Sequence, residues 1–439
     1  MRVIDYNKVE PDLQTSLLQR PLEQSRENRR QVVKNMIDDV RLRKDKALKD
    51  YTRQLDGVWL DRISVEKSEI NKAYGEVDDN KISLIEQIVQ RISAHHRVFK
   101  PSDKWIEEGR AIRCGKIYRP IHSVGLYVPG GFTPLISTVM MLAVPAKIAG
   151  CSHVAISTPV DRAGRIHPLI LVAADLCDVD VIYKLGGAQA IAAMAYGSES
   201  VQKVDKVYGP GNSWVTEAKL MVSQDPNAAA IDLPAGPSEV VVIADKNADA
   251  ALVAADLLAQ AEHGADSQVM LMTDSKMLAE EVVVEIDKQK SSLSRRAIIE
   301  MSLSHSLILV VDNIDQAIKL SNRYGPEHLI LQVDHAESYI SRIQAAGAVF
   351  IGAWSPETLG DYVTGSNHVL PTGGYARNSS GLTTADFMTA ISVQQMEKSG
   401  FEALADMAMA MAEIEGLEAH KNAVAIRIKR SRFSAETVL

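Results

Sequence analysis

The segment SVGLYVPGGFTPLISTVMMLAVPAKIAGCSHVAIS, residues 123–157, indicates the class of fold. It predicts a strand over Ser123–Pro129, a turn at two glycines, a helix over Leu135–Ala149 and a second strand over His153–Ser157. Strands that alternate with helices of this length form parallel sheets with right-handed crossovers. The segment therefore predicts an α/β fold.

The same alternation runs along most of the chain. It continues through strands at Val179–Leu185 and Lys203–Tyr208, each followed by a helix, and a second series starts at Glu239. The second series has strands at Val240–Ala244, Gln268–Met272, Leu307–Val311, His328–Leu331 and Ala348–Ile351, with helices near Asp249–His263, Lys276–Lys288, Ile314–Asn322 and Ala336–Ala345. Two such series predict two tandem Rossmann-like, doubly wound domains with a cleft between them. Helices are expected before the first series and at the C-terminal end.

Composition and charge narrow the class of protein. The chain has 439 residues, of which 46% are apolar and 24% charged, as in ordinary soluble globular proteins. Its net charge of −8 argues against nucleic acid or an anionic membrane surface as a partner. No apolar tract reaches the roughly 20 residues that span a bilayer. The first residues lack the apolar core of a secretory signal, so a cytoplasmic location is expected.

The three cysteines, Cys114, Cys151 and Cys177, have no spacing typical of a disulfide framework or a cysteine zinc site. Cys151 lies between an apolar helix and a strand, where a buried thiol is common. A nucleophilic cysteine needs an accessible, electropositive setting instead. We therefore expect that Cys151 is not a nucleophile.

Three junctions between a strand and a helix carry glycine, at Gly130-Gly131, Gly186-Gly187 and Gly209-Pro210-Gly211-Asn212. Glycine at such a junction lets backbone N–H groups approach a pyrophosphate at the start of the helix. The third junction departs from the G-x-G-x-x-G fingerprint at Trp214, and glycine is also the usual residue of any tight turn. A nucleotide site and ordinary turns remain equally compatible with these residues, and no ribose-binding acid can be identified.

Several polar residues have spacings that suit a metal site. Gln260 and His263 are three residues apart and share one face of a predicted helix. Asp361, His368 and His420 lie further along the chain. Nitrogen and oxygen ligands of these kinds can hold zinc with an open position. On spacing alone, however, a hydrogen-bonded polar cluster is favoured over a zinc site.

The pair Glu327-His328 follows Gly325-Pro326 and opens a predicted strand. Histidine is the natural base near neutral pH, and a glutamate can activate water. In an extended chain neighbouring side chains point to opposite faces, which argues against a joint role unless the turn redirects one of them. A catalytic pair and an ion pair at a strand edge are both compatible with the residues alone.

Eight motifs, taken together, closely resemble histidinol dehydrogenase. They occur in the same order from about Val3 to the last predicted helix. The motifs are GLYVPGG (125–131), GGAQAIAAMAYG (186–197), GPGN (209–212), DLPAGPSEV (232–240), AQAEHGADSQ (259–268), GPEHLI (325–330), GDYVTGSNHVLPT (360–372) and EGLEAH (415–420).

The resemblance implies a homodimeric enzyme with one zinc ion per subunit, which oxidises L-histidinol to L-histidine in two hydride transfers to NAD. It implies that His328 is the general base for the alcohol and that Glu327 activates the water that adds to the aldehyde. The implied zinc ligands are Gln260, His263, Asp361 and His420. The implied substrate-binding residues are Ser238, Gln260, His263, His328, Asp361, His368, Glu415 and His420, and the implied NAD-binding residues are Tyr127, Gln189 and Asn212.

Combined with the strand pattern, the resemblance predicts four parts. Residues 1–25 form an N-terminal arm, and residues 127–238 form a Rossmann-like domain that binds NAD. Residues 26–126 and 239–375 together form a discontinuous Rossmann-like domain with the base and most zinc ligands. Residues 376–439 form an extended C-terminal dimerisation segment, which brings Glu415 and His420 to the partner's site.

Two alternative functions are also considered. A related zinc- and NAD-dependent dehydrogenase for another small alcohol, such as a polyol or a sulfonate, should keep the zinc ligands and the catalytic pair. It should lose residues that read the amino and imidazole groups, so Ser238, His368, Glu415 and His420 favour histidinol. A nucleotide- or metal-binding protein without catalysis has no need of the pair Glu327-His328.

Overall fold

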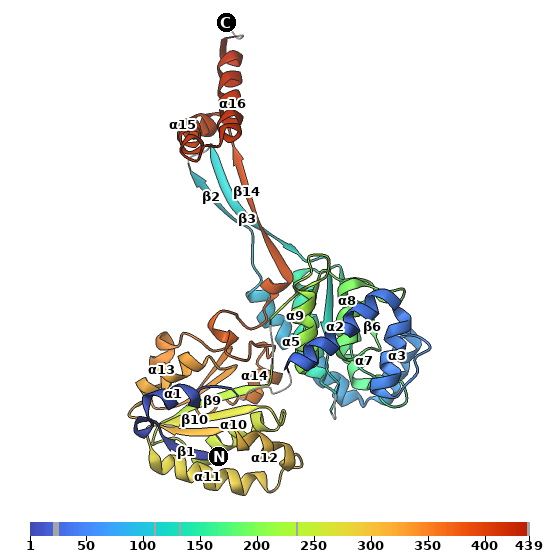
Figure 1. Cartoon of the computed structure of the whole chain (residues 1–439), viewed down its shortest axis with the longest axis vertical. Helices are drawn as coiled ribbons and strands as arrows, with labels where there is room; N and C mark the ends of the chain where they lie inside the picture. The colour runs from blue at the N-terminus through green and yellow to red at the C-terminus, as the bar shows by residue number, and fades with distance from the viewer. Residues whose placement is uncertain (21–25, 109–110, 131–132, 234–235, 437–439) are drawn as a thin grey trace. The chain divides into compact units, whose positions relative to one another are not determined.

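The computed structural model describes residues 1–20, 26–108, 111–130, 133–233 and 236–436 (Figure 1). The chain divides into two compact units, the first formed by residues 1–100 and 121–387 and the second by residues 101–120 and 388–439. The first unit contains two parallel sheets covered by helices, which confirms the α/β class. Among the described residues, no helix is both long and apolar enough to cross a membrane.

One sheet of the first unit has five parallel strands in the order β6-β5-β4-β7-β8. Counted from β4, this is the order 3-2-1-4-5, which matches the first five positions of the 3-2-1-4-5-6 order of a Rossmann fold. Every residue of β4 is buried, as expected where helices cover both faces of a sheet. The strands are β4 (Ser123–Tyr127), β5 (His153–Ser157), β6 (Val181–Tyr183), β7 (Lys206–Tyr208) and β8 (Ala230–Ile231), and the helices are α2 (Arg26–Arg43), α3 (Asp45–Asp56), α4 (Lys67–Glu76), α5 (Asp79–Val98), α6 (Ile136–Ala149), α7 (Pro168–Leu176), α8 (Gly187–Tyr196) and α9 (Ser213–Val222).

The other sheet has six parallel strands in the order β1-β11-β10-β9-β12-β13, which repeats the same core order when counted from β9. Its strands are β1 (Arg2–Asp5), β9 (Glu239–Ala244), β10 (Gln268–Thr273), β11 (Leu307–Val310), β12 (His328–Gln332) and β13 (Ala348–Ile351). Its helices are α1 (Pro11–Leu17), α10 (Ala250–Ala261), α11 (Lys276–Lys290), α12 (Arg296–Ser304), α13 (Ile314–Tyr324) and α14 (Glu357–Tyr362), with 3-10 helices η1 (Tyr6–Lys8), η2 (Ala336–Arg342), η3 (Tyr375–Arg377) and η4 (Thr384–Phe387). The helix expected near Ala336–Ala345 is thus the shorter 3-10 helix η2, and α12 was not expected.

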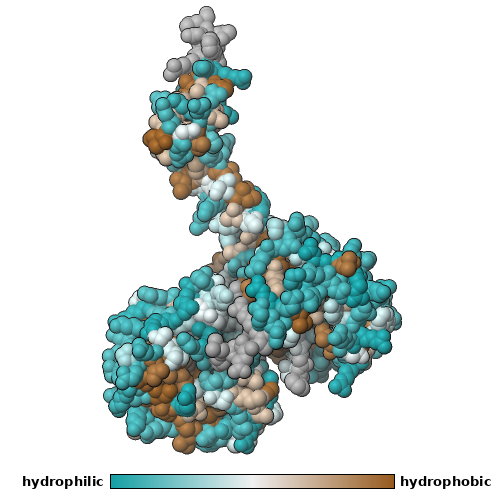
Figure 2. All heavy atoms as spheres, in the orientation of Figure 1, coloured by the Kyte–Doolittle hydropathy of each residue, from teal (hydrophilic) through white to brown (hydrophobic). Residues whose placement is uncertain are grey.

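The second unit is an antiparallel sheet in the order β14-β3-β2, followed by two helices. Its elements are β2 (Lys104–Glu108), β3 (Ile112–Pro120), β14 (Met388–Met396), α15 (Lys398–Ile414) and α16 (Glu418–Glu436). Figure 2 shows hydrophobic side chains on the surface of this unit. Those exposed on and between the two helices are Met407, Met411, Ile414, Leu417 and Ile426.

The N-terminal helices cover a different sheet from the one expected. The sequence-based prediction placed residues 26–126 in one domain with residues 239–375. In the structure, Ile37 of α2 and Leu48 of α3 instead share one apolar core with Ile191 of α8. They therefore cover the five-stranded sheet. The sequence of an amphipathic helix shows which of its faces is buried, but not against which sheet.

Two further segments are strands rather than an arm or part of a helical region. The expected arm, residues 1–25, begins with β1, which pairs with β11 at the edge of the six-stranded sheet. Residues 101–120 form β2 and β3, and β3 pairs with β14 along its whole length. The C-terminal segment expected at 376–439 therefore begins at Met388 as a compact unit and includes a piece of chain from before the first sheet.

Asp256, on α10, makes the stability of the fold depend on pH. Gln332 Nε2 donates a hydrogen bond to Asp256 Oδ2 over 2.7 Å, but burial still raises the pKa of Asp256 to about 6. An acid with a raised pKa in the folded state stabilises the fold while it is protonated and loses this contribution as the pH rises through about 6. Asp256→Asn should therefore gain free energy of unfolding over wild type, and the gain should grow by about 1 kcal/mol between pH 5 and pH 8. Urea unfolding at both pH values measures it, with the exposed Asp61→Asn as control. A gain that is the same at both pH values would contradict the assignment.

Candidate active site and cofactor cavity

A cavity of about 360 Å³ lies where the two sheets of the first unit face each other. Residues that follow β4 and β7 form one wall, at the carboxyl ends of the five-stranded sheet. Residues at the starts of β9, β10 and β12 form the other wall, at the amino ends of the six-stranded sheet. The cavity brings together seven of the residues singled out in the sequence, Asn212, Ser238, His263, Glu327, His328, Asp361 and His368.

Glu327 and His328 both line this cavity, although neighbouring residues of a strand usually point to opposite faces. The strand β12 begins only at His328, and Gly325 before it has a left-handed conformation with φ 63°. The turn therefore redirects Glu327. The backbone N–H of Glu239 donates to Glu327 Oε2 over 2.8 Å, and His328 Nδ1 lies 3.7 Å from the same oxygen.

Burial among carboxylates changes the acid strength of both groups. Burial raises the pKa of Glu327 to about 8, against the opposing effect of His328. Burial alone lowers the pKa of His328, but Glu357, Glu327 and Asp361 outweigh it and raise the value to about 10. His328 Nε2 is buried, lies 3.6 Å from Asp361 Oδ1 and has no hydrogen-bond partner among the described residues. Perturbed groups of this kind, gathered in a cavity, are typical of an active site.

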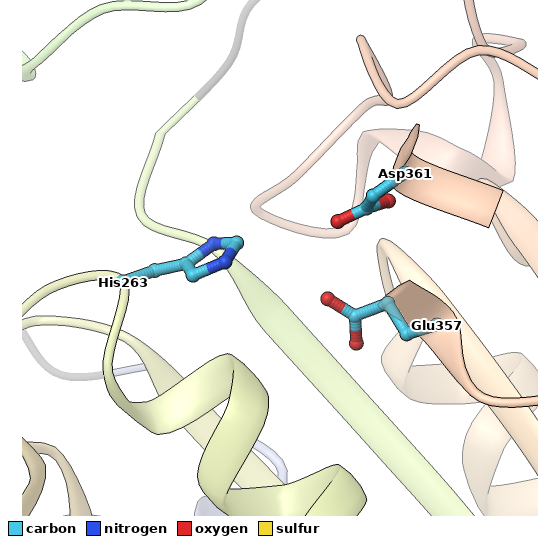
Figure 3. Close-up of side chains that lie close together, drawn as sticks. All are labelled: His263, Glu357 and Asp361. Atoms are coloured by element: carbon cyan, nitrogen blue, oxygen red, sulfur yellow. The ribbon is translucent and has the colours of Figure 1, made fainter. Parts of the chain in front are cut away.

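Three potential metal ligands converge beside this pair. Donor atoms of His263, Glu357 and Asp361 all lie within 4.8 Å of one another. Figure 3 shows the two carboxylates pointing from α14 toward the ring of His263. Glu357 and Asp361 are four residues apart on one helix and so share a face. Glu357 was not identified from the sequence, where only this i, i+4 spacing in ETLGD could have indicated it.

Gln260 lies between these potential metal ligands and the pair Glu327-His328. Its amide finds partners on both sides only when the nitrogen faces Glu357 and His328. The nitrogen then donates to the two oxygens of Glu357 over 2.5 and 2.8 Å and lies 3.1 Å from His328 Nδ1. In that orientation the amide oxygen faces His263 and is available to a metal ion. Gln260 is fully buried at the end of α10, so packing holds its side chain in place.

His368 has a defined tautomer because its Nδ1 lies 3.0 Å from the carbonyl oxygen of Asp361, which can only accept a hydrogen bond. The proton therefore sits on Nδ1, and the neutral ring presents Nε2 as an acceptor, 3.4 Å from Thr138 Oγ1. Burial lowers the pKa of His368, which favours this neutral form. Ser238 lines the same cavity just before β9.

A second cavity, of about 420 Å³, adjoins the first and contains the three residues expected to bind NAD. The backbone N–H of Gly187 donates to the hydroxyl of Tyr127 over 3.0 Å. Gln189 is buried on α8, and its Oε1 has no partner among the described residues. Asn212 caps α9 by accepting hydrogen bonds from the backbone of Trp214 and Val215. The cavity is thus bordered by the N-termini of α8 and α9, which attract anions such as phosphate.

A buried ion pair holds the loop that carries Asn212, and sequence analysis did not identify it. Lys219 Nζ lies 2.5 Å from Asp232 Oδ1, and both side chains are almost fully buried. Lys219 also donates to the carbonyl oxygen of Gly209, while the N–H of Gly209 donates to Asp232, each over 2.7 Å. The pair therefore fixes both backbone groups of Gly209.

Glu415 and His420 belong to the second unit. Glu415 is the C-cap of α15 and His420 lies in the first turn of α16, and both are exposed. The first unit by itself thus gathers three of the four expected zinc ligands, Gln260, His263 and Asp361.

Cys151 is buried, and burial raises the pKa of its thiol to about 11. A thiol that stays protonated near neutral pH is a poor nucleophile. Cys151→Ala should therefore keep kcat within a few-fold of wild type. A loss of more than about a hundredfold in kcat, which corresponds to a barrier increase of roughly 2.7 kcal/mol, would contradict this expectation.

Comparisons with known proteins agree with the resemblance found in the sequence. A family model described as histidinol dehydrogenase matches residues 18–428. The chain is 51% identical over 397 residues to histidinol dehydrogenase of Legionella pneumophila (strain Lens), which covers 90% of this chain and 92% of that protein. It is 47% identical over 428 residues to the enzyme of Xanthomonas oryzae pv. oryzae, with 98% and 99% coverage. The crystal structure of histidinol dehydrogenase from Elizabethkingia anophelis superposes with a TM-score of 0.94, at 42% identity and coverage of 98% and 99%. Because the family model and both relatives span nearly the whole chain, this protein belongs to the histidinol dehydrogenase family of oxidoreductases.

Proposed function

We propose that this chain oxidises L-histidinol to L-histidine by way of the aldehyde, with one zinc ion per subunit and two molecules of NAD per turnover. These are the last steps of histidine biosynthesis, which we place in the cytoplasm. The observation that carries the proposal is a single cavity in which Glu327 and His328 face the donor atoms of His263 and Asp361. An adjoining cavity at two helix N-termini suits a dinucleotide.

The donor set fits zinc, which takes nitrogen and oxygen ligands in sites with an open position. We assign Gln260, His263 and Asp361 as ligands, with His420 of the partner subunit as the fourth. Glu357 supports this assignment because it binds the amide nitrogen of Gln260 and so leaves the amide oxygen for the ion. When bound, zinc supplies positive charge that offsets the carboxylates around His328, and coordination positions for the imidazole and amino nitrogens of the substrate.

His328 takes the proton of the alcohol in the first step. Its Nδ1 lies 3.3 Å from the carbonyl oxygen of Glu239, which can only accept a hydrogen bond, so we place the proton of the neutral ring on Nδ1. Its Nε2 has no hydrogen-bond partner among the described residues and is free to accept a proton. The fixed ring orientation supports its role as a base.

Glu327 activates the water that adds to the aldehyde. Burial raises its pKa to about 8, which makes it a far stronger base than an ordinary carboxylate. The hydrogen bond from the N–H of Glu239 holds Oε2, which leaves Oε1 for the water. The resulting hydrate then loses a proton and a hydride to give the carboxylic acid.

Substrate recognition rests on groups at the edge of the cavity. The Nε2 acceptor of His368 and the hydroxyl of Ser238 suit the polar hydrogens of the substrate. Glu415 of the partner subunit supplies a negative charge for the ammonium group. A polyol or a sulfonate offers no ammonium or imidazole to these groups.

Tyr127, Gln189 and Asn212 line the cavity that we assign to NAD. The unpartnered Oε1 of buried Gln189 suits an amide or hydroxyl donor of the cofactor. NAD, when bound, accepts the hydride in each of the two oxidation steps.

We further propose a homodimer that forms through the second unit. Five large hydrophobic side chains are exposed on and between α15 and α16, as defined above, and their burial in a subunit interface would stabilise it. The same elements carry Glu415 and His420, so a dimer that exchanges this unit completes both sites.

Release of NADH on addition of L-histidinol tests the proposed function. Two NADH should form per histidinol, and a panel of polyols, hydroxy acids and hydroxylated sulfonates should give little. Preference for a polyol or sulfonate would favour the related dehydrogenase instead. Binding of NAD and zinc without turnover of any alcohol would favour a non-catalytic binding protein.

A further inference from the structure

Asp56 lines the cofactor cavity, although no sequence motif predicts a functional residue at this position. It is the last residue of α3, and the helix ends at Gly57, whose φ of 74° is left-handed. Asp56 lines the cavity of about 420 Å³ together with Tyr127, Gln189 and Asn212. It also lines a larger cavity of about 700 Å³ beside the amino end of α7. The carboxylate thus stands where the two cavities meet.

Nothing in the fold explains a carboxylate at this position. Asp56 Oδ2 is buried and has no hydrogen-bond partner among the described residues, whereas buried polar atoms are almost always paired. Burial raises the pKa of Asp56. The negative charge also sits at the C-terminus of a helix, where the helix dipole is unfavourable to it. The residue therefore costs stability, which is expected of a group that serves a ligand.

The other carboxylates of the larger cavity differ from Asp56 because each has a cation nearby. The ion pairs are Glu69 with Lys184 at 2.6 Å, Glu76 with Lys72 at 3.5 Å and Asp161 with Arg165 at 3.7 Å. Within the described part of the chain, Asp56 is the acid of this cavity that keeps its hydrogen-bonding capacity for a ligand.

The order of the cavities tells which part of a dinucleotide meets Asp56. All three cavities meet at Pro129, but Asn212 lines only the active-site and cofactor cavities, whereas Asp56 and Pro159 line only the cofactor cavity and the larger one. A nicotinamide ring beside His328 would put the pyrophosphate near the N-termini of α8 and α9. The adenosine ribose would then meet Asp56. The larger cavity beyond it is walled in part by apolar side chains suited to a flat base, among them Pro159, Pro168, Ile170 and Leu171.

We propose that Asp56 accepts hydrogen bonds from the hydroxyl groups of the adenosine ribose of NAD and excludes NADP, an inference that rests on the proposed use of NAD. A carboxylate offers acceptors only, which match the two hydroxyl donors of a ribose. A 2′-phosphate removes one donor and brings negative charge against Asp56, so the same group that attracts NAD repels NADP. Lys72 and Arg165, the cations that line the larger cavity, each already have a carboxylate neighbour, Glu76 at 3.5 Å and Asp161 at 3.7 Å.

Isothermal titration of the protein with NAD, NADP, ADP-ribose and 2′-phospho-ADP-ribose tests the proposal without turnover. Wild type should bind each unphosphorylated ligand at least about tenfold more tightly than its 2′-phosphorylated counterpart. Asp56→Asn should weaken the binding of NAD and of ADP-ribose by about tenfold, because hydrogen bonds to a charged group are lost. The preference for these ligands over their 2′-phosphorylated counterparts should fall by at least as much, because the repulsion of the phosphate disappears as well. Asp61→Asn, exposed and outside the cavities, is the matched control and should change nothing.

The ligand-free protein gives a second measurement. Because Asp56 is desolvated and unpaired, Asp56→Asn should unfold at the same temperature as wild type or a higher one. A lower unfolding temperature would make Asp56 a structural residue and overturn the proposal. If wild type prefers NAD to NADP and Asp56→Asn keeps the same preference, the role proposed for Asp56 is overturned, but the proposed use of NAD is not. A wild type that binds neither NAD nor ADP-ribose would overturn the proposed NAD use as well.

Discussion

Glu327→Gln is expected to slow oxidation of the aldehyde by about 10²–10⁴-fold while alcohol oxidation stays near the wild-type rate. Glutamine keeps the shape of the side chain and can still accept the hydrogen bond from the N–H of Glu239, which spans 2.8 Å in the wild type. It cannot take a proton from water. His328→Asn should produce the opposite pattern and slow the alcohol step by a similar factor, because the free Nε2 is lost.

Single-turnover kinetics with histidinol and with histidinaldehyde as separate starting substrates distinguishes the two roles. NADH formation is the readout for both half-reactions. Glu262→Gln, next to the proposed zinc ligand His263 but outside the cavity, is the control for removal of a nearby carboxylate. If both variants slowed both half-reactions equally, Glu327 and His328 would act as one positioning unit and the division of roles would be wrong.

Removal of the metal with a chelator is expected to lower turnover by at least about a hundredfold and to leave most of the fold intact. The assigned ligands are held by elements with their own apolar cores. Gln260 lies on α10 beside Leu257, Leu258 and Ala261, which are buried in the core of the six-stranded sheet. The ion is therefore not the main determinant of the fold, unlike the ion of a zinc finger.

The measurement combines NADH release with far-ultraviolet circular dichroism before and after chelation, followed by addition of zinc. Chelator already saturated with zinc serves as the control. Cooperative unfolding of the metal-free protein at room temperature would show that the ion holds the fold together. Full turnover by protein that retains no metal would show that the cluster of His263, Glu357 and Asp361 is a polar network instead.

The local pattern of the sequence was sufficient to predict most strands and helices of both parallel sheets. Strand periodicity, helix length and glycine at the turns are properties of short windows, so they predicted most strands from Ser123 to Ile351 within a few residues. The motifs also named residues that the structure brings into one cavity, such as His263, His328 and Asp361. Their roles in catalysis stay predictions until the experiments above are done.

Pairings between distant segments depended on tertiary structure. Residues 101–120 have no signal that directs them to β14, and β1 has none that directs it to the edge beside β11. Tertiary packing likewise determined which sheet the helices α2 and α3 cover. A window of sequence records which side of an element is apolar but not which partner covers it, because the partner is fixed by long-range packing.

The chemistry of the site shows the same division most clearly. The sequence determined that Glu327 and His328 are adjacent, but only the turn at Gly325 lets both face one cavity. Glu357 and Asp56 lie on helices and belong to no sequence motif, so only their surroundings in the structure indicate a role. Glu357 accepts hydrogen bonds from the Gln260 amide, and Asp56 Oδ2 has no hydrogen-bond partner among the described residues. The sequence alone thus determined which chemical groups are present and on which elements they lie. The tertiary structure decided their environment, because burial and neighbouring charge set both the pKa and the hydrogen-bonding capacity of a side chain.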